Sequence, residues 1–414
     1  MRVLILGMNY APESTGIAPY TTEFAEYLAK AGHEVHVITA KPHFPQWKIW
    51  DDYRGRRRRT ERVDGVWIHR TYAYVPRKPR KVWNRILYDS VFSISVLLRA
   101  LFMRRFDTVF VVSPPVQLGL TGWLLAQRHR APLFFHIKDI VSLAVVGTGM
   151  VRSSSMISRM ARGVEDLTHH CADAIGVICD AFEQYLRGSG VPARKIVFFP
   201  DYIDTSLLQP GPRVGPFRNR HKLGESEFVV MYSGGIAQKQ GLETLVEAAG
   251  HAPRLRFFII GEGPTKSDLE KKVQTAGLAN VTMLPLQPKA TLGQQLSAAD
   301  VLVLTQKRTI TDAVFPSKLL AYMACGRPVV VAAADNSETA RFVRRHDVGI
   351  VVPPEDPAAL AAALTTLAEN PDRAAQLGRK GLRTVLSTYE KNIVLERMND
   401  MLTRRQFATG SETI

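Results

Sequence analysis

Short apolar runs alternate with longer amphipathic patterns along almost the entire chain. In the first half, the strand-like runs lie at 3–7, 34–39, 65–70, 108–112, 133–137, 174–178 and 196–199. In the second half, they lie at 228–233, 255–261, 281–284, 301–304, 328–332 and 349–352. Regular alternation of short strands with helices is typical of α/β folds with parallel sheets. The pattern therefore predicts an α/β protein.

Helical patterns occupy most of the intervals between these runs. Residues 21–31 place apolar or small side chains on one face, and Gly32 follows them as a helix C-cap. Residues 358–367 form a second clear amphipathic pattern, which follows a proline-rich turn. Because parallel strands need crossover connections, we expect helices to link the strands throughout the chain.

The alternation is interrupted at residues 201–220, which are rich in proline and glycine and lack a periodic apolar face. We interpret this stretch as a linker between two doubly wound, Rossmann-like domains, residues 1–200 and 221–385. The remaining segment, 386–414, contains a helical pattern that we expect to pack back on the first domain. Ligands of such sheets bind beyond the carboxyl ends of the strands. Two domains of this kind that face each other predict a binding cleft between them.

The composition is that of a soluble globular protein, with 46% hydrophobic and 22% charged residues. Three cysteines occur without a CxxC pair or a zinc-binding spacing, which predicts reduced thiols and a cytoplasmic protein. We find neither a signal-peptide pattern nor an apolar run of the ~18 residues that a membrane-spanning helix needs. The net charge of +16 indicates an anionic partner: nucleic acid, an anionic membrane face or a phosphate-rich substrate.

The segment 310–332 predicts a loop, a helix and a buried strand. Pro316 sits at the start of the helix, where its missing N–H costs little, and Ser317 and Lys318 follow in the first turn. A lysine there is unfavourable against the helix dipole, unless an anion docks at the same place. Free backbone N–H groups with a cation at a helix N-terminus suit a diphosphate. The alternative is an ordinary αβ unit with a surface lysine.

In each predicted domain, a glycine-containing loop follows the first strand. Residues 9–19 form a loop longer than the ~2–6 residues usual at such positions, and its Gly16 permits close approach to a ligand. In the second domain, Gly234 and Gly235 precede Lys239 and a helix, an arrangement that suits a phosphate cradle. This loop matches neither a Walker loop nor the dinucleotide-binding fingerprint.

His136 stands at the carboxyl end of the buried run 133–137, with Asp139 shortly after it. Its position favours a functional role, whereas its two phenylalanine neighbours favour a structural one. We find no Ser-His-Asp pattern, no metal-ligand spacing and no paired carboxylates at helical spacing, so neither an obvious nucleophile nor a metal site is predicted.

Basic and aromatic residues cluster in the first domain. Arg56, Arg57, Arg58 and Arg59 form a basic run, and residues 82–105 predict a helix with apolar side chains over much of its surface. The flanking arginines and Trp83 suit an interfacial helix on an anionic leaflet. The alternative is a helix buried against the first sheet.

Motifs along nearly the full length resemble those of retaining glycosyltransferases of the GT-B fold, in the large family 4. The opening MRVLILGMNYAPESTGIAPYTTEFAEYLAK resembles the branch that builds colanic acid, O-antigen and other exopolysaccharides. The runs YSGGIAQKQGLETLVEAA, DAVFPSKLLAYMACGRPVV and VGIVVPPEDPAAL resemble the nucleotide-binding domain of that family.

The resemblance implies a nucleotide-sugar donor, held mainly by the second domain, and transfer with retention of configuration and without a metal or other cofactor. Its diphosphate site would comprise Gly234, Gly235, Lys239, Ser317 and Lys318, with Gly16 on the opposing loop. His136 matches the histidine that lies near the transferred sugar. The implied acceptor is a polyprenyl-diphosphate-linked saccharide. The basic first domain, with Arg56 to Arg59 and Trp83, would meet this acceptor at the inner face of the plasma membrane.

Two departures from the family pattern concern donor binding. Ala313 and Ala321 stand where most of the family has two glutamates, one of which grips the ribose, so Asp312 and Asp139 become the candidate ribose or sugar contacts. The arginine and lysine of the family's glycine loop correspond to Gly235 and Gln240, which leaves Lys239 one position away.

Three rival functions remain at this stage. A sugar-nucleotide epimerase or phosphorylase would share the fold, and a degenerate transferase could serve as a scaffold. A non-enzymatic basic protein that binds nucleic acid or membrane would explain the charge. The sequence contains no recognised nucleic-acid-binding module, so we do not expect a nucleic-acid partner.

Overall fold

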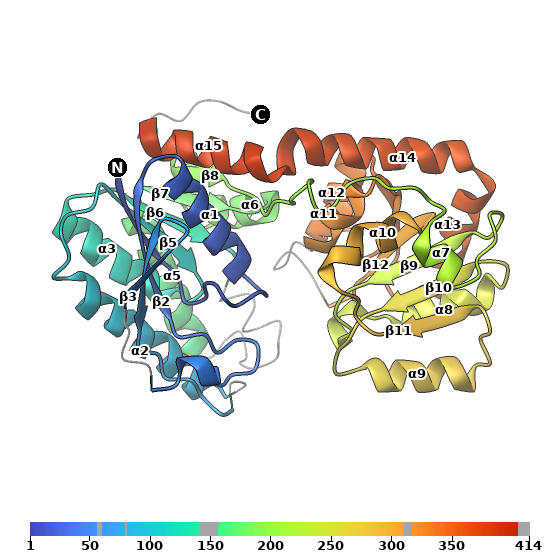
Figure 1. Ribbon diagram of the computed structural model, residues 1–414, viewed down its shortest axis with the longest axis horizontal. Coiled ribbons are helices and arrows are strands. Elements are labelled where there is room, and N and C mark those ends of the chain that lie inside the picture. Colours follow the sequence, from blue (N-terminus) through green and yellow to red (C-terminus); the bar gives the residue numbers. More distant parts are fainter. Residues whose placement is uncertain (56–59, 79–80, 141–155, 310–316, 405–414) are drawn as a thin grey trace. The chain divides into compact units, whose positions relative to one another are not determined.

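The computed structural model describes residues 1–55, 60–78, 81–140, 156–309 and 317–404 (Figure 1). The chain forms two compact units, one made of Met1–Pro200 with the segment from Leu395 onward, and the other of Asp201–Val394. Each unit is an α/β layered structure built on its own sheet, which confirms the predicted class of two doubly wound sheets.

The first unit contains an eight-stranded sheet in the order β3-β4-β2-β1-β5-β6-β7-β8. Its strands are β1 Arg2–Leu6, β2 Glu34–Ala40, β3 Thr60–Val63, β4 Val66–Thr71, β5 Thr108–Ser113, β6 Leu133–Ile137, β7 Ala174–Val177 and β8 Ile196–Phe198. All neighbouring strands pair in parallel except β3 and β4. The antiparallel edge strand β3 was not predicted, because its sequence TERV carries no apolar run.

Helices cover both faces of this sheet. They are α1 Ala18–Lys30, α2 Val82–Ala100, α3 Gln117–His129, α5 Met156–Cys171 and α6 Asp180–Gly188, joined by the C-terminal part of α15 Lys391–Arg404. Helices α2, α3 and α5 pack side by side, and Gly119 of α3 lies against Phe135 of β6. On the opposite face, Phe24 of α1 packs on Phe110 of β5, with ring centroids 4.8 Å apart. Apolar side chains thus point to both faces of the sheet, as a parallel sheet covered by helices on both sides requires.

The second unit contains a six-stranded, wholly parallel sheet in the order β11-β10-β9-β12-β13-β14. Its strands are β9 Val229–Ser233, β10 Arg256–Ile260, β11 Val281–Leu284, β12 Val301–Thr305, β13 Val329–Ala332 and β14 Gly349–Val352. Its helices are α7 Pro216–Arg220, α8 Glu243–His251, α9 Lys266–Thr275, α10 Leu292–Ser297, α11 Ser317–Ala324, α12 Glu338–His346, α13 Pro357–Glu369 and α14 Pro371–Thr384. A π-helical turn, Val385–Tyr389, follows α14.

The strand order of each sheet reverses at one point. In the first unit, the reversal lies between β1 and β5, and in the second it lies between β9 and β12. Crevices at the carboxyl ends of strands on either side of such a reversal are the usual ligand sites of doubly wound folds. The loops after β1 and β9 are those that contain Gly16 and Gly234, so both glycines lie at a predicted binding position.

Two further features bear on the sequence predictions. Residues 216–220, at the end of the predicted linker, form α7, and its Arg218 is fully buried. The segment from Leu395 belongs to the first unit, where Asn399 of α15 lies 2.8 Å from Nε2 of His33.

Candidate functional site

The loop after β9 is held in place by backbone contacts to the loop after β10. The amide of Gly234 donates to the carbonyl of Ile260 at 2.9 Å, and the amide of Ile236 donates to that of Glu262 at 2.8 Å. A Cβ atom on Gly261 would lie 1.8 Å from the carbonyl oxygen of Gly234. Only glycine permits this approach, so the two loops form one rigid turn beside the strand ends.

Lys318, in the first turn of α11, lies over this turn. A Cβ atom on Gly234 would lie 1.9 Å from Cε of Lys318, and Nζ of the lysine is 5.6 Å from the ring centroid of Tyr232. Burial, and then the nearby charge of Lys239, lower the pKa of Lys318 to about 8. Two like charges beside free helix N–H groups are unfavourable unless an anion joins them, which is the chemistry of a phosphate site.

Tyr322 fixes α11 to β9. Its hydroxyl accepts a hydrogen bond from the amide of Ser233 at 2.9 Å and donates to the carbonyl of Ser233 at 3.0 Å. Gln295 of α10 donates to Oγ of Ser233 at 2.8 Å. Because three elements meet at Ser233, the position of Lys318 relative to the glycine turn is set by buried contacts.

The structure thus brings together most of the residues that the sequence assigned to the diphosphate. Gly234 and Lys318 are in contact, and Lys239 is close enough to shift the pKa of that lysine. The carbonyl of Gly235 accepts a hydrogen bond from the hydroxyl of Tyr232 at 2.6 Å, and Ser317 is the exposed first residue of α11.

Two glutamines next to this cluster were not singled out from the sequence as binding residues. Oε1 of Gln240 and Oε1 of Gln306 are buried, and neither has a hydrogen-bond partner among the described residues. Thr305, at the end of β12, donates to the carbonyl of Gln240 at 2.5 Å, so both amides lie near the reversal point of the sheet. The position of Gln306 directly after a central strand is the signal that could have identified it.

The other predicted residues are in the first unit or outside the described residues. Asp312, Ala313 and the run Arg56 to Arg59 are outside the described residues. Gly16, His136 and Asp139 belong to the first unit. Gly16 has a φ of +65°, and a Cβ atom on it would lie 3.5 Å from the ring of Phe44. Asp139 is partly buried just after β6 and has interaction partners.

The His136 side chain lies inside the first unit. Its Nε2 donates to the carbonyl oxygen of Phe199 at 3.0 Å, and its ring stacks on that of Phe199 with centroids 4.3 Å apart. Burial, and then the charge of Lys138, hold the pKa of His136 well below its ordinary value. The imidazole is therefore neutral, with Nδ1 as its hydrogen-bond acceptor.

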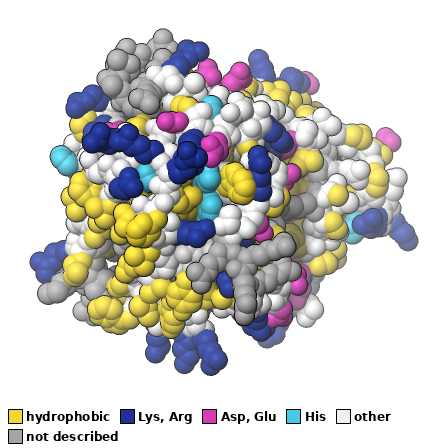
Figure 2. Space-filling view, turned by 60° about the vertical axis from the view of Figure 1, so that its left-hand side comes forward, with side chains coloured by type: hydrophobic (Ala, Val, Ile, Leu, Met, Phe, Trp, Pro, Cys, Tyr) yellow, Lys and Arg dark blue, Asp and Glu magenta, His cyan; other side chains and the backbone are white. Residues whose placement is uncertain are grey.

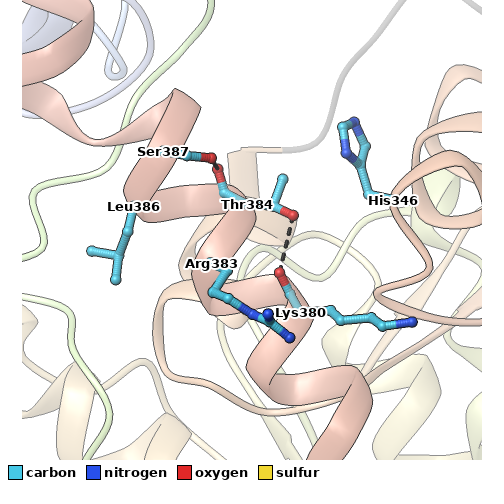
Figure 3. A pocket seen from close by; sticks show the side chains of 6 residues that line it. All are labelled: His346, Lys380, Arg383, Thr384, Leu386 and Ser387. Atoms are coloured by element: carbon cyan, nitrogen blue, oxygen red, sulfur yellow. Dashed lines mark hydrogen bonds between the residues drawn. The ribbon is translucent and has the colours of Figure 1, made fainter.

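A hollow of about 650 Å³ occurs in the second unit, around the end of α14. Its lining residues are His346, Lys380, Arg383, Thr384, Leu386 and Ser387. Figure 3 shows that their side chains diverge, and Lys380 is already paired with Asp347. The hollow does not assemble a reactive group. Within the described residues, no group of three or more His, Cys, Asp or Glu side chains could hold a metal ion.

Helix α2 exposes an apolar stripe opposite its buried face. Its exposed side chains are Trp83 (72%), Leu87 (47%), Ile94 (57%) and Leu98 (61%), and Phe102 (85%) continues the line. Figure 2 shows hydrophobic side chains gathered on this side of the first unit, with Lys and Arg at the margins. The helix therefore packs against the unit by one face and presents the other to its surroundings. No helix in the described ranges is long and apolar enough to cross a bilayer.

Comparisons with known proteins find family matches in both units. Residues 15–201 match the glycosyl transferase 4-like domain, and residues 215–384 match glycosyl transferases group 1. The chain is 34% identical over 377 residues to the putative colanic acid biosynthesis glycosyl transferase WcaI of Escherichia coli K12, covering 88% of this chain and 91% of that protein. It is 24% identical over 302 residues to the probable glycosyltransferase WbjE of Pseudomonas aeruginosa, covering 70% and 74%.

Solved structures share the whole fold. Sucrose-phosphate synthase of Thermosynechococcus elongatus has a TM-score of 0.74 at 23% identity, over 99% of this chain and 100% of that one. The glycosyltransferase WaaG of lipopolysaccharide biosynthesis has a TM-score of 0.67 at 14% identity, over 97% and 99%. Anabaena HepE, solved in complex with UDP, has a TM-score of 0.73 at 15% identity, over 98% and 100%.

The fold and these family matches define a glycosyltransferase of the GT-B fold that uses a nucleotide sugar. More narrowly, the chain belongs to group 1, family 4, whose members are retaining enzymes. The resemblance predicted from its sequence motifs is confirmed.

Proposed function

We propose that the protein transfers a sugar from a nucleoside-diphosphate sugar to a polyprenyl-diphosphate-linked saccharide during cell-surface polysaccharide synthesis. The proposed binding of the nucleotide-sugar donor rests on the contact of Lys318 with Gly234 beside Lys239. Two neighbouring ammonium groups repel each other, and a bound diphosphate would offset this repulsion. The acceptor half rests on the similarity to the putative colanic acid enzyme of Escherichia coli.

In the proposed reaction, the bond between the anomeric carbon and the diphosphate oxygen breaks. The acceptor oxygen bonds to the same face of the anomeric carbon, and its hydroxyl proton passes to the departing diphosphate. Lys318, Lys239 and the N–H groups at the start of α11 stabilise the charge that develops on the diphosphate. This route needs neither a protein nucleophile nor a metal.

His136 is the proposed catalytic residue of the first unit. A neutral imidazole whose Nε2 is held by Phe199 offers Nδ1 to a hydroxyl of the transferred sugar. Asp312 and Asp139 remain the proposed ribose and sugar contacts. The side-chain oxygens of Gln240 and Gln306, which lack a partner among the described residues, are further candidates for binding donor hydroxyls, because a buried acceptor without a partner favours a ligand that supplies one.

We further propose that the protein works on the cytoplasmic side of the plasma membrane, bound peripherally. The apolar stripe of α2 would enter the interface, while Arg56 to Arg59 and the other cations of the first unit would meet anionic headgroups.

The function is tested by thermal shift of the purified protein against UDP, GDP, ADP, dTDP and CMP, with single-stranded DNA as a control. A ligand at ~100 times its dissociation constant adds about 2.7 kcal/mol of stability, which is readily visible. Selective stabilisation by one nucleoside diphosphate supports the proposal and identifies the base. Stabilisation by DNA alone contradicts it.

A further inference from the structure

Asp89 is a buried acid on the inner face of α2 that the proposed chemistry does not use. The residue is only 8% exposed, and its Oδ1 has no hydrogen-bond partner among the described residues. The cation beside it is Arg85, whose Nε lies 3.7 Å from Oδ1, beyond hydrogen-bonding distance. Burial raises the pKa of Asp89 to about 7, against the opposing effect of Arg85. A carboxylate kept in this state is costly to the fold unless something supplies hydrogen-bond donors.

An aromatic frame surrounds this ion pair. The guanidinium carbon of Arg85 is 5.3 Å from the ring centroid of Trp47 and 5.2 Å from that of Tyr88. The rings of Trp47 and Tyr88 are themselves 5.2 Å apart. Trp47 has a φ of +54°, a conformation that costs a bulky residue about 1–3 kcal/mol. The strained tryptophan and the Oδ1 of Asp89, which has no hydrogen-bond partner in the described part of the chain, are therefore two independent departures from stable packing within one cluster.

Buried contacts hold the cluster in position. Oε1 of Glu13, in the loop after β1, accepts the amides of His43 at 2.7 Å and Phe44 at 2.8 Å. Nε2 of His43 lies 2.6 Å from the hydroxyl of Tyr88. The loops after β1 and β2 are thus joined to α2 at the carboxyl ends of those strands. This is the binding edge of a doubly wound sheet, next to its reversal point.

We propose that Asp89, Arg85 and Trp47 form a subsite for the acceptor saccharide, which takes a neutral, polyhydroxylated ring. The proposal rests on the transferase function and extends it to the second substrate. Sugar hydroxyls donate to Asp89 and accept from Arg85, while the indole offers apolar surface to the ring. The carboxylate disfavours an anion and the guanidinium disfavours a cation, so the pair selects an uncharged ligand.

The test uses the full chain and isothermal titration with octyl glycosides of glucose, galactose, mannose and N-acetylglucosamine. We expect at least one glycoside to bind the wild-type protein and Asp89→Asn to weaken its affinity by about tenfold or more, because a charged acceptor is lost. The melting temperature of Asp89→Asn should equal or exceed that of the wild type, since the buried charge is removed. Its stabilisation by the nucleotide, measured in parallel, should be unchanged.

Asp52→Asn, which neutralises an exposed acid of the same unit, is the matched control and should behave as the wild type. Arg85→Met is the second variant, and its melting temperature is measured in parallel, because the change leaves the buried Asp89 without its cation. Removing the guanidinium also removes a hydrogen-bond donor to the sugar, so this variant should bind the glycosides more weakly than the wild type does.

Two results would overturn the subsite. One is wild-type glycoside affinity in Asp89→Asn, and the other is no binding of any glycoside by a wild-type protein that does bind a nucleotide. In both cases the transferase function stands. Absence of nucleotide binding together with glycoside binding that depends on Asp89 would instead support the subsite and contradict the proposed donor site.

Discussion

The stem of Lys318 fills the space that the missing side chain of Gly234 leaves, since a Cβ atom there would lie 1.9 Å from Cε of the lysine. Gly234→Ala should therefore push the ammonium group away from its place beside Lys239. The blocking atoms belong to a flexible chain, so the fold should survive with a loss of about 1–3 kcal/mol, most of it from the φ of +150°. Nucleotide affinity should fall by about tenfold or more.

Differential scanning fluorimetry and titration with the stabilising nucleotide measure both effects. The matched control is Gly250→Ala, at an exposed helical position of the same unit, where the added methyl meets Leu278 at an ordinary 3.6 Å. The control should bind as the wild type and be slightly more stable. Equal affinities in Gly234→Ala and Gly250→Ala would contradict the assigned role of the turn.

The pKa of Lys318 predicts how donor binding depends on pH. In the free protein this pKa is lowered to about 8, and a bound diphosphate should raise it, because the anion favours the charged ammonium. Below pH 8 the lysine is charged in both states and affinity is constant. Above pH 8 the free protein loses the proton, so affinity should fall by up to about tenfold per pH unit, and binding should take up a proton.

Titration calorimetry in two buffers of different ionisation enthalpy at pH 8.5 measures the proton uptake. Lys318→Arg provides the comparison, since a guanidinium stays charged throughout this range and should abolish the uptake. The same shift affects stability. The pKa of Lys318 is lower in the folded protein than in the unfolded chain. Burial of the charged lysine therefore lowers the free energy of unfolding by its full amount below pH 8, and this loss decreases as pH rises from 8 towards 10.5. A pH-independent affinity between 7 and 9.5 would rule out Lys318 as a diphosphate contact.

Periodicity and strand-end loops were enough to predict the two sheets and the glycine turn, because both are local in sequence. The contact between Gly234 and Lys318 followed only from resemblance, since no local pattern specifies which helix start meets which turn. Asp89 was not predicted at all. Helical periodicity places it on the inner face of α2, but the lack of a donor to its Oδ1 among the residues that the structure describes depends on packing. The proline-rich stretch before α7 likewise gave no sign that Arg218 is buried.

Arg218 and Asp300 form a buried ion pair that should stabilise the second unit. The Nη2 of Arg218 donates to Oδ2 of Asp300 at 2.6 Å, and the same oxygen accepts the amide of Val229 at 2.7 Å. Arg218→Met would leave Asp300 with its other cation, Arg213, but would remove the buried donor to the carbonyl of Ala298, so we expect a loss of about 1–3 kcal/mol. Urea denaturation measures this loss. Arg404→Met, which breaks an exposed pair with Asp400, should cost less than about 1 kcal/mol. Similar losses in both variants would contradict the importance of the buried pair.

The apolar stripe of α2 should mediate attachment to lipid. Leu98 and Phe102 are 61% and 85% exposed, so their replacement by aspartate should leave the melting temperature almost unchanged. Burial of a leucine or phenylalanine side chain contributes about 1.5–3 kcal/mol, and the introduced acids also repel anionic lipid. The double variant Leu98→Asp, Phe102→Asp should therefore bind vesicles of phosphatidylglycerol and phosphatidylethanolamine at least about tenfold more weakly than the wild type.

Cosedimentation with vesicles measures this partitioning. Leu207→Asp, at a 74% exposed apolar position of the second unit, is the control and should bind as the wild type. If the double variant and this control bind vesicles equally, α2 is not the attachment surface, and the stripe must serve another partner.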